Sequence, residues 1–101
     1  MAASERLLAH IAADFGVSED ELLAASLLEY LKSKKVACMA DKLEILSRYS
    51  VSSSKELEEA IENGKIAEHP SWEDLILIEN LNAKIKKLEK EIANIESLPG
   101  T

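Results

Sequence analysis

The most regular hydrophobic pattern of the chain lies in its last third, between Pro70 and Leu98. Apolar residues recur there in alternating steps of three and four positions, which places them along one side of a helix. Full burial of one such side chain contributes roughly 1.5–3 kcal/mol, so we predict a helix over residues 72–97 whose apolar seam is covered. The seam consists of Ile78, Leu81, Ile85, Leu88, Ile92 and Ile95.

Two kinds of surface can cover this seam. A seven-residue period that is sustained over several turns is typical of a coiled coil, in which the helix pairs with a second copy or with a partner protein. Alternatively, the helix packs back on a long helix of its own chain. The pattern favours the coiled coil or partner and leaves the second alternative open.

Capping signals predict two helices in the first half of the chain. Ser4 is suited to cap a short helix that ends at Gly16, where a left-handed residue is favoured. Ser18 with Glu21 forms a capping box, which predicts that the next helix begins at residue 19. No Gly or Pro interrupts residues 19–49, although the apolar face changes midway. We therefore predict one long helix there, continuous or kinked.

Two further capping signals follow a serine-rich linker. Ser53 with Glu56 predicts a short helix that stops at Gly64. Ser71 with Asp74 predicts the start of the last helix. Because every strong signal is helical, the predicted fold class is all-α, a helical hairpin or bundle with no sheet.

Size and charge narrow the classes of function. The chain has 101 residues, near the lower end for an independent core, so partner chains fit its size. Its net charge of -7 at pH 7 repels phosphate backbones, so we do not expect this chain to bind DNA. The single Cys38, the absence of a secretory signal and the lack of an apolar run of about 20 residues indicate a cytoplasmic protein without a membrane span.

Catalytic and metal-binding patterns are absent from the sequence. His10, Cys38 and His69 lie about thirty residues apart, a spacing that does not fit a zinc site. Gly64 and Lys65 mark a helix end and lack the further glycines of a phosphate-binding loop. We therefore expect no enzyme activity, no cofactor and no metal.

Trp72 is the only tryptophan, and it lies where the last helix is predicted to begin. A large rigid side chain at such a position is suited to fill a partner's pocket. The alternative is a local role, in which the indole closes the preceding loop over the helix. Both alternatives stay open at this point.

Residues 55–81, KELEEAIENGKIAEHPSWEDLILIENL, resemble the C-terminal region of archaeal antitoxins encoded beside PIN-domain ribonuclease toxins. The resemblance implies an antitoxin that neutralises a PIN-type ribonuclease by covering its active site. It also implies a basic side chain over the toxin's acidic metal site, for which Lys84, Lys86 and Lys87 are candidates. The implied anchors are Trp72, Leu75, Ile76, Ile78 and Leu81, and the seam residues Ile85, Leu88, Ile92 and Ile95 extend this partner-binding surface.

Residues 4–34 are similar to the helix pair of ribbon-helix-helix proteins, with Gly16-Val17-Ser18 at the turn. This resemblance implies either an intertwined helical dimer or a bare helix pair, and we expect a homo-oligomer, most simply a homodimer. The DNA-reading strand of that family has no counterpart, since only residues 1–3 precede the predicted helix, so DNA binding is not carried over.

The alternative function is a structural protein that forms a homo-oligomeric coiled coil or bundle without a toxin. The expected parts are a dimerisation-like region (1–50), a short helix with linker (51–70) and a partner-binding helix (71–101).

Overall fold

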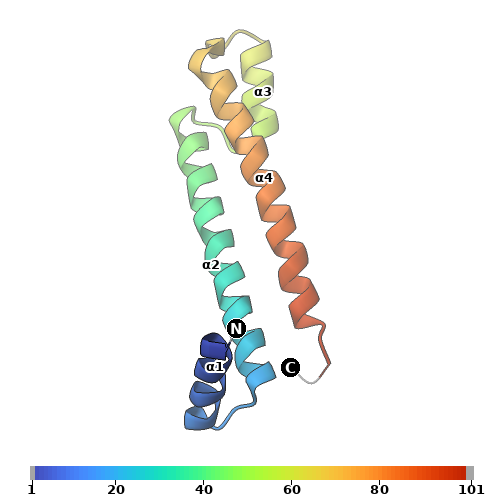
Figure 1. Cartoon of the computed structure of the whole chain (residues 1–101). Coiled ribbons are helices and arrows are strands. Elements are labelled where there is room, and N and C mark those ends of the chain that lie inside the picture. The colour runs from blue at the N-terminus through green and yellow to red at the C-terminus, as the bar shows by residue number, and fades with distance from the viewer. Residues whose placement is uncertain (1, 100–101) are drawn as a thin grey trace.

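The computed structural model describes residues 2–99, which form four helices (Figure 1). Helices α2 and α4 run side by side in opposite directions as a long hairpin, α3 lies beside the end where they are connected, and α1 folds back on the start of α2. No strand occurs within residues 2–99, which confirms the all-α fold class. The helices span Ala2–Phe15 (α1), Glu19–Arg48 (α2), Ser54–Glu62 (α3) and Glu68–Glu96 (α4).

Several predicted helix ends are confirmed. The hydroxyl of Ser18 accepts a hydrogen bond of 3.0 Å from the backbone N–H of Glu21, and α2 continues from there as a single helix of 30 residues. Ser53 caps α3 in the same way. Gly16 and Gly64 have φ angles of 66° and 73°, the left-handed conformation that glycine adopts without a steric penalty.

Two predicted caps are wrong. Helix α1 begins at Ala2, so Ser4 lies inside it. Helix α4 begins at Glu68, earlier than predicted, with one extended residue, His69, before Pro70. Ser71 is consequently inside the helix. Because its hydroxyl is buried and needs a partner, it donates a hydrogen bond to the carbonyl of Ala67 instead of capping the helix.

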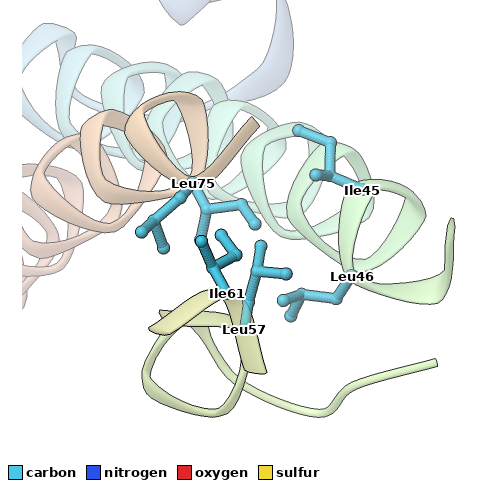
Figure 2. Close-up of a cluster of buried hydrophobic side chains, with 6 residues drawn as sticks. Ile45, Leu46, Leu57, Ile61 and Leu75 are labelled. Atoms are coloured by element: carbon cyan, nitrogen blue, oxygen red, sulfur yellow. The ribbon is translucent and has the colours of Figure 1, made fainter. Parts of the chain in front are cut away.

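A buried apolar cluster joins α2, α3 and α4 at the connected end of the hairpin. Its members come from all three of the expected parts of the chain. Figure 2 shows Leu57 and Ile61 of α3 pointing toward Leu75 of α4, with Leu46 of α2 beside Leu57. The cluster consists of Ile45, Leu46, Leu57, Ile61, Leu75 and Ile78.

Beyond this cluster, the hairpin consists of a single pair of helices, α2 and α4, with α1 against the start of α2. Its radius of gyration is 19.8 Å, whereas a compact domain of this length has a value of about 13 Å. The longest dimension is 61 Å and the other two are 26 and 20 Å. A two-helix layer covers apolar side chains incompletely, and many remain partly accessible along its length.

Candidate protein-binding surface

The apolar seam of α4 faces α2 of the same chain. Ile78 is completely buried and Leu88 is 9% exposed. The structure therefore has the arrangement in which the helix packs back on the long helix of its own chain. Leu75, another implied anchor, is also buried. The remaining seam residues are half-buried, namely Leu81, Ile85, Ile92 and Ile95.

The two implied anchors that remain accessible are Trp72 and Ile76, whose exposed fractions are 49% and 45%. They are four residues apart in α4, so they lie on the same side of the helix, one turn apart. Their neighbours Ser71 and Leu75 are buried on the side that faces the core. Trp72 and Ile76, termed the Trp72 patch, therefore form an exposed apolar surface above a packed base.

Polar contacts fix the helix that carries this patch. The Tyr49 hydroxyl, just beyond α2, donates a hydrogen bond to the Asp74 carboxylate in α4. Arg48 also reaches Asp74, with Nη1 lying 3.8 Å from Oδ2, and its Nη2 lies 3.1 Å from Oε1 of Glu44. These contacts hold the first turns of α4 against the end of α2. The sequence places Tyr49 at the start of the serine-rich linker, and no local pattern indicates its partner 25 residues away.

The Tyr49 contact predicts a pH dependence of stability. The hydrogen bond to Asp74, followed by burial, raises the pKa of Tyr49 above its usual value near 10. The neutral hydroxyl is the stabilising form, so its contribution is complete below about pH 10 and is lost as the pH rises through the folded-state pKa. We expect Tyr49→Phe to lower the free energy of unfolding by about 1 kcal/mol at neutral pH.

Urea unfolding of the wild type and Tyr49→Phe at stepwise pH checks this expectation. The difference in free energy of unfolding should stay constant from neutral pH to about pH 9 and shrink above about pH 10. A difference that is unchanged well above that range would contradict a stabilising role for the Tyr49 hydroxyl.

Charged side chains flank the Trp72 patch. His69 Nδ1 lies 3.0 Å from Oε1 of Glu73, and both side chains are largely exposed. Lys87 follows Ile76 by eleven residues, close to three full turns, so it lies on the same side of α4 about 16 Å further along. Lys84 and Lys86 are rotated away from this line. Of the three lysine candidates, the helix geometry therefore aligns Lys87 with the patch.

Within residues 2–99, no three His, Cys, Asp or Glu side chains are grouped so that they could hold a metal ion. Cys38 is buried, and His10 pairs with Asp14 at 3.3 Å on exposed α1. None of the helices in this range has the length and apolar content needed to cross a membrane. The Trp72 patch is thus the best-defined candidate surface on α4.

Comparison with known proteins identifies one family. The model of a family described as the uncharacterized protein MJ0235 family matches residues 1–98. The matched range includes all four helices, the buried cluster and the Trp72 patch. No curated protein and no solved structure matches the chain.

Proposed function

The chain belongs to the uncharacterized protein MJ0235 family, and we propose that it is an antitoxin-like binding protein that neutralises a PIN-type ribonuclease. It is not an enzyme in this proposal, and it acts in the cytoplasm by covering the active site of its partner. The observation that carries the proposal is the half-exposed Trp72 beside Ile76 on a firmly packed helix. The PIN-type identity of the partner comes from the resemblance of residues 55–81 to antitoxins.

The Trp72 patch has the physical properties of an interface hot spot. Tryptophan is enriched among residues that dominate binding energies, especially where a rigid side chain enters a dry pocket. A tryptophan side chain buries about 150–250 Å² when it is fully covered. Covering the exposed half of Trp72 would therefore contribute on the order of 2–3 kcal/mol. Because α4 is already fixed by the core and by Asp74, little ordering entropy is lost on binding.

Lys87 supplies the electrostatic part of the proposed mechanism. With the Trp72 patch seated in a groove of the ribonuclease, α4 would extend across the entrance of the active site. Lys87 lies on the same side of the helix, so its ammonium group would lie near the acidic residues that such enzymes use to bind metal. A cation there opposes metal binding and neutralises the carboxylates. The buried residues Leu75 and Ile78 are not part of this proposed contact surface.

The proposal is tested with a purified PIN-domain ribonuclease, chosen from any that are encoded beside this chain in its genome. The purified chain is titrated into the enzyme, and cleavage of an unstructured RNA is followed together with the heat of binding. We expect cleavage to fall in proportion to the complex formed, with saturation at a fixed stoichiometry. Undiminished cleavage at a large excess of the chain, without a heat of binding, would exclude this function.

Lys87 offers a matched pair of variants for the same assay. We expect Lys87→Ala to raise the dissociation constant about tenfold, which corresponds to about 1.4 kcal/mol. Lys86→Ala removes the same charge from a different side of α4 and should leave the dissociation constant nearly unchanged. Equal effects of the two variants would mean that only the net charge matters, and this would contradict the placement of Lys87.

A further inference from the structure

Helix α2 carries a second amphipathic pattern on a side that α4 covers only in part. Its residues recur in steps of three and four, so they lie along one side of the helix. Leu23 and Leu27 are each 46% exposed and Tyr30 is 59% exposed. The apolar face of this helix changes midway along its sequence, and the structure leaves these three side chains of its first half accessible. The pattern, termed the α2 strip, comprises Asp20, Leu23, Leu27, Tyr30 and Lys34.

The α2 strip borders an apolar groove between α2 and the end of α4. Two adjoining hollows of about 370 and 310 Å³ share Leu27, Ile95 and Leu98 in their walls, so they form one continuous groove. Leu98 is 50% exposed and Ile95 is only half-buried. The open end of the hairpin therefore presents partly exposed apolar side chains from α2 and from the end of α4 on one face.

We propose that a second copy of this chain covers the α2 strip, with the two α2 helices antiparallel about a two-fold axis near Leu27. Asp20 lies seven residues before Leu27, and Lys34 lies seven residues after it. The two-fold axis therefore brings Asp20 of each copy within about one helical turn of Lys34 of the other. The apolar residues between them meet at the centre, and the two hairpins together form a four-helix arrangement.

The charges at the two ends select this orientation. In a parallel pair, Asp20 would lie opposite Asp20 and Lys34 opposite Lys34, and both contacts would be repulsive. In the antiparallel pair, both ends of the interface join opposite charges. Lys34 already lies over the strip, with Nζ 5.7 Å from the centre of the Tyr30 ring. The strip is thus complementary to a reversed copy of itself, which favours self-association over an unrelated partner.

The size of the surface sets the expected strength of the dimer. The strip spans fourteen residue steps, or about 21 Å of helix. The contact extends over α2 and the adjoining end of α4, two helices that are each about 10 Å wide, so it covers roughly 450 Å² per copy, below the roughly 800 Å² per partner of typical specific interfaces. We therefore expect a reversible dimer with a dissociation constant in the micromolar range.

Sedimentation equilibrium over a micromolar concentration series tests the proposal with a matched pair of variants. Leu27→Asp places two carboxylates near the axis and should raise the dimer dissociation constant at least about 100-fold. Leu43→Asp makes the same change on the opposite side of α2, at a residue that is 62% exposed, and should leave dimerisation unchanged. Circular dichroism of both variants establishes that the helices are intact.

Exchanging the charges at the two ends of the strip provides a second test, which does not depend on the Leu27→Asp variant. Asp20→Lys and Lys34→Asp should each weaken the dimer about tenfold, whereas the double variant should recover most of the wild-type affinity because the opposite charges still meet. A wild type that stays monomeric throughout the series would overturn the proposal. So would a Leu27→Asp variant that dimerises like the wild type, or a double variant that is no tighter than the single ones.

Discussion

Replacing Ile78 with alanine is expected to lower the free energy of unfolding by about 2–5 kcal/mol. Ile78 is completely buried in the cluster that joins α2, α3 and α4, so truncation leaves a cavity and removes packing from all three helices. Total stabilities of small domains are about 5–15 kcal/mol, which makes this loss a large fraction of the whole. Thermal unfolding should show a fall in melting temperature of at least about 8 °C.

The adjacent residue provides the control. Leu77 is 51% exposed, so Leu77→Ala should change the free energy of unfolding by no more than about 0.5 kcal/mol. Similar losses at Ile78 and Leu77 would contradict the packing of the α4 seam against α2 and α3. Ile92, at the half-buried end of the same seam, should give an intermediate loss on truncation to alanine.

Replacing Trp72 with alanine is expected to weaken binding to the PIN-type ribonuclease by about 2–4 kcal/mol. This range corresponds to a rise in dissociation constant of roughly 30- to 900-fold. The reason is that the substitution removes the largest exposed apolar side chain of α4 while the buried base beneath it stays intact. Calorimetric titration of the ribonuclease with wild type and variant measures the effect directly.

Leu77→Ala is again the matched control, because it truncates an equally exposed apolar residue on a different side of α4. We expect its dissociation constant to stay within about threefold of the wild type, a difference of roughly 0.7 kcal/mol. Far-ultraviolet circular dichroism should show the same helix content for both variants. If Trp72→Ala binds as tightly as Leu77→Ala, the Trp72 patch is not the binding surface.

Local signals in the sequence were sufficient to predict most of the fold. Ser18 and Ser53 cap helices as expected, and Gly16 and Gly64 end them, because capping depends on residues only a few positions apart. Residues 19–48 contain no Gly or Pro and form one continuous helix, which is one of the two alternatives predicted for this stretch. The start of α4 could not be predicted from local signals. Ser71 is buried by the tertiary structure, and its hydroxyl donates a hydrogen bond to the Ala67 carbonyl instead of capping the helix.

The surface that covers each apolar face was harder to predict than the helices themselves. The regular seam of α4 has the same period whether it meets another chain or α2, so periodicity could not distinguish these alternatives. The less regular α2 divides its apolar residues between a face toward α4 and an exposed strip through Leu27. The candidate anchors Trp72 and Ile76 could be named from sequence, but their separation from buried Leu75 and Ile78 required the structure.

The most direct test of binding through the Trp72 patch is to observe Trp72 itself, which is the only tryptophan of the chain. Incorporation of 5-fluorotryptophan gives a single fluorine signal, which is observed by NMR while the unlabelled PIN-type ribonuclease is added. We predict that the signal of the half-exposed indole shifts, or broadens and reappears at a new position, in step with complex formation. A signal that stays at the position of the free chain while the complex forms would contradict binding through Trp72.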